Sequence, residues 1–125
     1  MASSKPRVLL VDDDPSIQKI YKKRLVVAGY EVQTCFDGEE ALQQVRTHPP
    51  EVIILDIMLP KLNGYEVCSR LKDDAATKDI PIIMFTARGE LPHHIAGFLV
   101  GANAYISKTC DSKLLLEQVQ SLVKK

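Results

Sequence analysis

A single carboxylate, Asp56, stands inside an otherwise apolar stretch that runs from Val52 to Leu59. The four residues before it read V-I-I-L, and such a run is typical of a strand that is buried on both faces. Asp56 then falls at the carboxyl end of that strand. An unpaired carboxylate inside a core is very costly, so Asp56 either lies at the mouth of the sheet or pairs with cations. The alternative is an ordinary loop aspartate that only ends the strand.

Polar residues also stand directly after the other apolar runs. Three carboxylates, Asp12, Asp13 and Asp14, follow the run V-L-L-V. The hydroxyl of Thr86 follows the run I-I-M-F, and the ammonium of Lys108 lies just beyond the last apolar strand. The carboxyl ends of parallel strands share one edge of a sheet, and such sheets bind ligands there. We therefore expect one cluster, formed by Asp12, Asp13, Asp56, Thr86 and Lys108.

The chemistry of this cluster points to magnesium and phosphate. Three converging carboxylates repel one another unless a cation neutralises them. Mg²⁺ prefers oxygen ligands and needs only one or two carboxylates besides water and phosphate oxygens, and no His or Cys stands nearby to suggest zinc. The Lys108 ammonium and the Thr86 hydroxyl suit other oxygens of a tetrahedral dianion. A carboxylate in this setting can attack a phosphoryl group, and Asp56 is the predicted nucleophile. Asp14 is predicted to cap the following helix instead.

Five strands that alternate with five helices position these residues. The predicted strands cover residues 8–11, 31–35, 52–56, 82–86 and 104–106, and the predicted helices cover residues 15–28, 38–46, 65–71, 92–100 and about 111–123. Each helix is read from apolar residues at helical spacing; the first one uses Ile17, Ile20, Tyr21, Leu25 and Ala28. This alternation predicts an α/β domain with a mostly parallel sheet, right-handed crossovers and helices on both faces.

Length and charge limit the possible functions. The 125 residues predict one domain, residues 1–125, with residues 1–5 as a flexible tail. The 16 basic and 16 acidic residues cancel, which argues against binding nucleic acid or a membrane surface by bulk charge. No membrane span or signal peptide is apparent, so a cytoplasmic location is expected. Three widely spaced cysteines indicate neither a disulfide framework nor a zinc site.

Four motifs together resemble the receiver domain of bacterial two-component response regulators, of the single-domain, chemotaxis-regulator type. The motifs are V-D-D after the first strand, L-D-I-M-L-P-K-L-N-G around Asp56, F-T-A at Phe85 to Ala87, and G-A-N-A-Y-I-S-K ending at Lys108. The resemblance implies a flavodoxin-like sheet in the order 2-1-3-4-5.

The resemblance also implies a role for each site residue. Asp56 would accept a phosphoryl group from a histidine kinase or phosphotransfer protein, so the protein would not be an enzyme beyond its own phosphorylation and dephosphorylation. Asp13, Asp56 and the backbone carbonyl of Met58 would bind Mg²⁺, and Asp12 would reach it through water. Lys108 would contact the phosphoryl group. Thr86 and Tyr105 would form a switch that changes the helix 4, strand 5 and helix 5 face for an unknown downstream protein partner.

Two features depart from the family pattern. Receivers usually carry proline after the lysine, in a cis bond, whereas Thr109 follows Lys108 here. Either the loop holds a cis bond, which costs about 2.5 to 4 kcal/mol without proline, or it takes another path; a cis bond is expected, because Lys108 has a dianion to meet. The segment 92–100 contains no Lys, Arg, Asp or Glu, so Leu91 and Leu99 are predicted to help form an apolar docking face.

Two alternatives remain open at this stage. A pseudo-receiver would keep the acids as an interaction module that does not depend on phosphorylation. An aspartate-based phosphohydrolase is less well supported, because the acids after the first strand are adjacent rather than alternating. No effector domain is visible in the sequence, so no direct nucleic-acid partner is expected.

Overall fold

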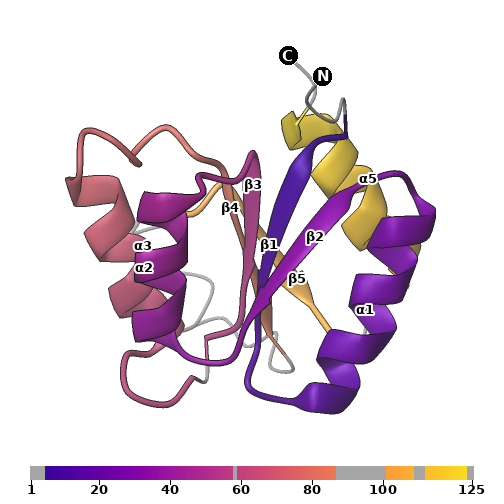
Figure 1. Cartoon of the computed structure of the whole chain (residues 1–125), viewed down its shortest axis with the longest axis horizontal. Coiled ribbons are helices and arrows are strands. Elements are labelled where there is room, and N and C mark those ends of the chain that lie inside the picture. The colour runs from indigo at the N-terminus through magenta and orange to yellow at the C-terminus, as the bar shows by residue number, and fades with distance from the viewer. Residues whose placement is uncertain (1–4, 58, 87–100, 109–111, 124–125) are drawn as a thin grey trace.

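The computed structural model describes residues 5–57, 59–86, 101–108 and 112–123 (Figure 1). Its five strands are all parallel and form one sheet in the order β2-β1-β3-β4-β5. Their bounds are β1 Arg7–Val11, β2 Glu31–Cys35, β3 Val52–Leu55, β4 Ile82–Thr86 and β5 Ala104–Ser107. The fold class and the strand order predicted from the sequence are confirmed.

Helices cover both faces of the sheet, as Figure 1 shows. Helices α1 (Pro15–Val27) and α5 (Ser112–Val123) lie on one face, and α2 (Gly38–Thr47) and α3 (Gly64–Asp73) lie on the other. The predicted helix at 92–100 and the proposed docking residues Leu91 and Leu99 fall outside the described residues. Within the described ranges, no helix has the length and apolar character that a bilayer crossing requires.

Strand residues alternate between two apolar layers, one under each pair of helices. In β1, for example, Leu9 and Val11 face α2 and α3, whereas Val8 and Leu10 face α1 and α5. The residues of β3 repeat this alternation, and all four are fully buried. Burying a side chain of this size contributes roughly 1.5 to 3 kcal/mol, so the two layers hold the strand ends in place.

Local signals explain where α1 begins and ends, although its inward face differs from the prediction. Asp14 caps the helix by accepting the Ser16 N–H at 2.9 Å, as predicted, and Pro15 occupies the first turn. Gly29, with φ at 105°, supplies the left-handed conformation that ends it. Ile20, however, is 47% exposed, and the polar Gln18 is buried in the second turn. The inward face therefore includes an amide that apolar spacing alone does not identify.

Candidate functional site

Asp56 lies at the carboxyl edge of the sheet, directly after β3. Its backbone N–H donates to the Val11 carbonyl at 3.0 Å and so extends the pairing of β1 with β3 by one bond. Asp56 is only 4% exposed. A carboxylate at this depth requires cationic or hydrogen-bonding partners, because burial without them is costly.

The turn after Asp56 packs the start of α3 against the Asp56 backbone. Asn63 and Glu66 form a capping box, in which each side chain accepts the other residue's backbone N–H. Gly64 opens the helix, and a Cβ at this position would lie 2.3 Å from the Asp56 carbonyl oxygen. Only glycine allows so close an approach without a shift of the backbone. The Asn63-Gly64 pair therefore makes the turn from β3 into α3 and fixes the position of the Asp56 backbone.

Two further carboxylates reach the same edge from the end of β1. Asp12 is 1% exposed, its N–H donates to the Cys35 carbonyl at 3.1 Å, and its Oδ1 accepts the Asp14 N–H at 2.9 Å. Asp13 is exposed. One oxygen from each of Asp12, Asp13 and Asp56 lies within 4.8 Å of the other two. The clustering of these three carboxylates agrees with the prediction from strand ends.

Lys108 brings a positive charge to this cluster. Its Nζ lies 2.5 Å from Asp12 Oδ2 and 3.2 Å from Asp56 Oδ2, and its side chain is 12% exposed. The ammonium also lies 5.9 Å from the centre of the Phe85 ring, within range of a cation–π contact. Burial acts to lower the pKa of Lys108, but the hydrogen bonds and charges of Asp12 and Asp56 outweigh it and raise that pKa above 10.5. Lys108 therefore remains charged at neutral pH and reaches Asp56.

The structure describes the other predicted site residues only in part. Thr86 is the last residue of β4 and pairs with Ser107 in the sheet, but its side chain is outside what the structure describes. Met58 and the Lys108–Thr109 bond also fall outside the described residues. Tyr105 is half-buried on β5, packs against the apolar layer under α2 and α3, and hydrogen-bonds Tyr65 of α3. The Tyr105 hydroxyl therefore has a protein partner.

The charge balance of the cluster favours a divalent cation. Among the residues that the structure describes, three carboxylates against one ammonium leave two formal negative charges at this edge of the sheet. Carboxylate oxygens are ligands that suit Mg²⁺. The described cysteines do not compete for this role, because burial raises the pKa of Cys35 to about 12 and that of Cys68 to about 11. These two thiols are protonated and unreactive at neutral pH.

Comparison with known proteins places this arrangement in a family. The model of the response regulator receiver domain matches residues 8–120. The chain belongs to the response regulator receiver domain family. A putative response regulator from Chloroflexus aurantiacus has a solved structure that superposes with a TM-score of 0.93 at 38% identity, covering 98% of this chain and 100% of that one. Receiver domains typically bind Mg²⁺, and they are not enzymes in the conventional sense.

Longer relatives correct the expectation about nucleic acid. This receiver is 42% identical over 125 residues to the probable transcriptional regulator ycf27 of Pyropia yezoensis, covering all of this chain and 50% of the relative. It is 41% identical over 120 residues to the DNA-binding dual master transcriptional regulator RpaA of Synechocystis, covering 96% and 50%. The receiver thus spans about half the length of these relatives. The prediction of no direct nucleic-acid partner is wrong, because these relatives are transcriptional regulators and one of them is named as DNA-binding. The charge balance of residues 1–125 carries no information about the half of these relatives that the chain does not cover.

Sequence reasoning missed two residues of this receiver that contact the predicted site residues. Tyr65 is the first residue of the helix predicted over residues 65–71, and its spacing does not indicate that it hydrogen-bonds Tyr105. Gln18 was not singled out, yet its amide contacts the backbone of Asp12. The available signal was a polar residue close to the inward positions of a helix. Such a residue is either exposed or hydrogen-bonded, and spacing alone cannot distinguish the two.

Proposed function

We propose that this receiver accepts a phosphoryl group on Asp56 from a histidine kinase or phosphotransfer protein, with Mg²⁺ held by Asp12, Asp13, Asp56 and the backbone carbonyl of Met58. The observation that supports the proposal is the buried Asp56 carboxylate, with two other carboxylates within 4.8 Å and the Lys108 ammonium at 3.2 Å. Carboxylates can serve as covalent nucleophiles toward phosphoryl groups, provided that the charge of the phosphate is neutralised nearby.

The chain's own residues account for most of the proposed chemistry. An Asp56 oxygen attacks phosphorus, and the new O–P bond forms as the P–N bond to the donor histidine breaks. Bound Mg²⁺ supplies positive charge to the phosphate oxygens. Lys108, which bridges Asp12 and Asp56 in the described state, is placed to pair with a phosphoryl oxygen once Asp56 is modified. Gly64 holds the Asp56 backbone so that the carboxylate keeps this orientation.

Substituting each of the three acids after β1 should distinguish the proposed Mg²⁺ ligands, Asp12 and Asp13, from the helix cap, Asp14. We expect Asp13→Ala to weaken Mg²⁺ binding strongly and Asp12→Ala somewhat less, because Asp12 would act through water. Asp14→Ala should leave Mg²⁺ affinity almost unchanged while costing about 1 kcal/mol of stability through the lost helix cap. Calorimetric titration with magnesium chloride measures the affinities. Equal losses of affinity in all three variants would contradict the ligand assignment.

Replacing the glycine that approaches Asp56 should impair phosphorylation more than folding alone explains. Gly64→Ala forces a Cβ against the Asp56 carbonyl, so we expect a loss of about 1 to 3 kcal/mol in unfolding free energy. The displaced carboxylate should take up phosphate from acetyl phosphate about 100-fold more slowly. Gly29→Ala is the control, because it strains a positive φ but meets no atom within 4 Å. Identical phosphorylation rates in the two variants would show that Gly64 does not position Asp56 for phosphorylation.

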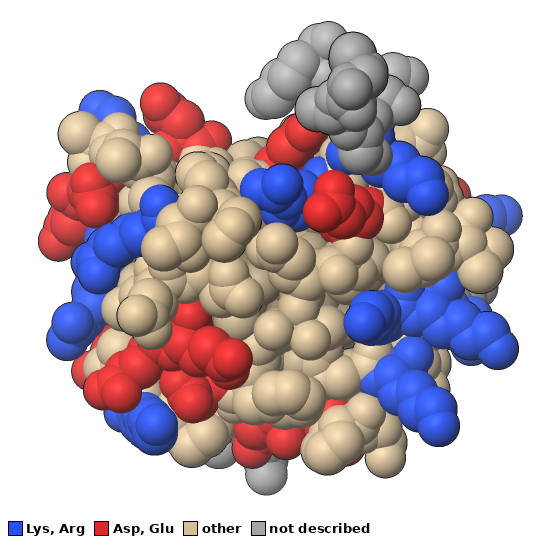
Figure 2. Space-filling view, in the orientation of Figure 1, with Lys and Arg blue, Asp and Glu red and all other residues tan. Residues whose placement is uncertain are grey.

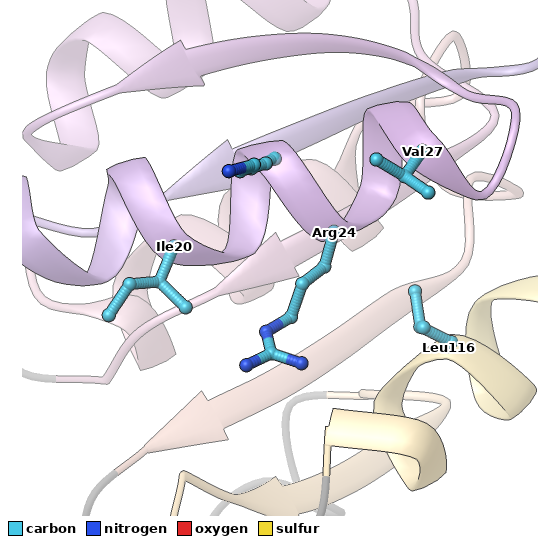
Figure 3. Close-up of a pocket in the computed structure, with 5 residues that line it drawn as sticks. Ile20, Arg24, Val27 and Leu116 are labelled. Atoms are coloured by element: carbon cyan, nitrogen blue, oxygen red, sulfur yellow. The ribbon is translucent and has the colours of Figure 1, made fainter.

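A groove between α1 and α5 is the surface on which we place the phosphodonor protein. It has a volume of about 530 Å³, and its lining consists of Ile20, Lys23, Arg24, Val27 and Leu116. Figure 3 shows Ile20, Arg24 and Val27 on α1 and Leu116 across from them on α5. Basic side chains gather over α1 in the space-filling view of Figure 2. An apolar floor with a basic rim suits an amphipathic helix that carries carboxylates.

A negative charge placed in this groove should slow phosphorylation by the phosphodonor protein but not phosphorylation by acetyl phosphate. We expect Ile20→Glu to slow transfer from the phosphodonor protein roughly 30-fold, the effect of losing about 2 kcal/mol at an interface hot spot. Phosphorylation by acetyl phosphate should be unchanged, because it requires no docking. Val26→Glu is the matched control, since Val26 lies on the same helix, is 46% exposed against 47% for Ile20, and does not line the groove. A donor that works equally well on both variants would place the docking surface elsewhere.

Output is proposed to pass through the β5 side of the receiver. Phosphorylation would draw Thr86 toward the site, and Tyr105 would exchange its bond to Tyr65 for a new position on the helix 4, strand 5 and helix 5 face. RpaA is named as a DNA-binding transcriptional regulator, so we propose that this state of the receiver controls a transcriptional output. Moving such a two-state equilibrium from about 1:99 to 99:1 requires roughly 5.5 kcal/mol of differential binding.

A further inference from the structure

Gln18 connects the second turn of α1 to the strand ends that carry the acids. It is 4% exposed, and its Nε2 lies 2.6 Å from the Cys35 carbonyl oxygen, 3.0 Å from that of Asp12 and 3.2 Å from that of Leu10. The first of these carbonyls ends β2, and the other two belong to the end of β1. One amide group on a helix therefore binds both strand ends next to the acidic cluster.

The register of the sheet shows that the Gln18 amide takes the place of a backbone hydrogen bond between β1 and β2. Val11 pairs with Cys35, and the Asp12 N–H donates to the Cys35 carbonyl at 3.1 Å. The next bond of a parallel ladder would run from the N–H of Asp37 to the Asp12 carbonyl. At that point, however, β2 has ended and Asp37 caps α2. The Gln18 amide donates to the Asp12 carbonyl instead.

The orientation of the amide is fixed by its neighbours. Reversing it would place Oε1 against three carbonyl oxygens, whereas the observed orientation offers them two N–H donors. In this orientation Oε1 is buried and has no hydrogen-bond partner among the described residues. An apolar side chain would avoid that unsatisfied acceptor. The role of this amide therefore lies in its NH₂ group, which donates to backbone carbonyls.

We propose that Gln18 is a positioning residue for the Mg²⁺-binding aspartates, an inference that rests on the proposed function. The Asp12 carbonyl and the Asp13 N–H belong to one planar peptide unit. Holding that carbonyl fixes the plane of the unit and so the direction in which the Asp12 and Asp13 side chains leave the backbone. Gln18 thus acts on the metal site through the backbone, without touching metal or phosphate.

The test compares Mg²⁺ affinity in variants that lose similar hydrogen bonds in different places. Gln18→Met removes the amide at nearly constant length, and Gln18→Asn keeps an amide but shortens its reach, which provides a milder variant. Thr77→Val is the matched control, because Thr77 is 3% exposed and its Oγ1 donates to the Leu71 carbonyl at 2.7 Å, in the loop after α3. Calorimetric titration with magnesium chloride gives the affinity, and urea unfolding gives the stability.

We expect Gln18→Met to bind Mg²⁺ about 10-fold more weakly than the native chain, as for other residues that orient metal ligands, and Gln18→Asn to show a smaller loss in the same direction. Thr77→Val should lose stability and keep native affinity. Gln18 variants that match Thr77→Val in affinity would overturn the positioning role while leaving the proposed function intact. A native chain that binds no Mg²⁺ would overturn both.

Discussion

Asp56→Asn should abolish phosphorylation and leave the fold intact. The amide is nearly isosteric with the carboxylate but is a poor nucleophile, so no O–P bond forms at this position. The substitution also removes one charge from three clustered carboxylates, and Lys108 keeps its partner Asp12. The melting temperature should therefore be unchanged or higher. Incubation with acetyl phosphate and magnesium chloride, followed by intact-protein mass spectrometry, measures the loss.

Asp37→Asn is the control for this experiment. Asp37 caps α2 by accepting the Glu40 N–H at 2.8 Å, and Asn caps helices about as well. The variant undergoes the same chemical change outside the acidic cluster, so it should be phosphorylated at the native rate. Phosphoryl uptake by Asp56→Asn equal to that of Asp37→Asn would show that the nucleophile is another residue.

Lys108→Met should be both unstable and slow to phosphorylate. Removing one partner of a buried charge pair leaves the other charges uncompensated, so we expect a loss of about 3 kcal/mol or more in unfolding free energy. Phosphorylation should slow by about 100-fold or more, the usual effect of losing one group that stabilises developing negative charge. Urea unfolding and acetyl phosphate kinetics provide the two measurements.

A second substitution and a pH series identify the source of the instability. Asp12→Asn in the Lys108→Met background should recover part of the stability, because it removes a carboxylate left without its cation. The pKa of Lys108 is raised above 10.5, so the ion pair contributes its stability at neutral pH and loses it as the pH rises through that pKa. The difference in unfolding free energy between the native chain and Lys108→Met should thus stay constant through neutral pH and become smaller above pH 10.5. A difference that does not change at high pH would show that packing, not charge, causes the instability.

The positions of the acids followed from the sequence because parallel strands align their ends. Apolar runs located β1 and β3, and Asp12, Asp13 and Asp56 come directly after them. Asp14 was recognisable as a cap because Pro15 and a helical pattern follow it. These inferences succeeded because local chemistry and the fold agree at each of these positions.

Tertiary contacts account for what the sequence did not indicate. Ile20 shows helical apolar spacing, but it lies on the flank of α1 that lines the groove and is not in the core. The close approach of Gly64 to Asp56 depends on where α3 docks, and the hydrogen bond between Tyr65 and Tyr105 joins two separate elements. None of these contacts has a period or motif in the sequence, because each depends on how the elements pack.

Mapping the site of phosphorylation tests the central claim most directly. The native chain is incubated with acetyl phosphate and magnesium chloride, any acyl phosphate is reduced with borohydride, and the modified residue is located by peptide mass spectrometry. The account predicts modification of Asp56 alone, with none when the metal is removed by a chelator. An unmodified Asp56, as expected of a pseudo-receiver, or modification of a different carboxylate would contradict the account.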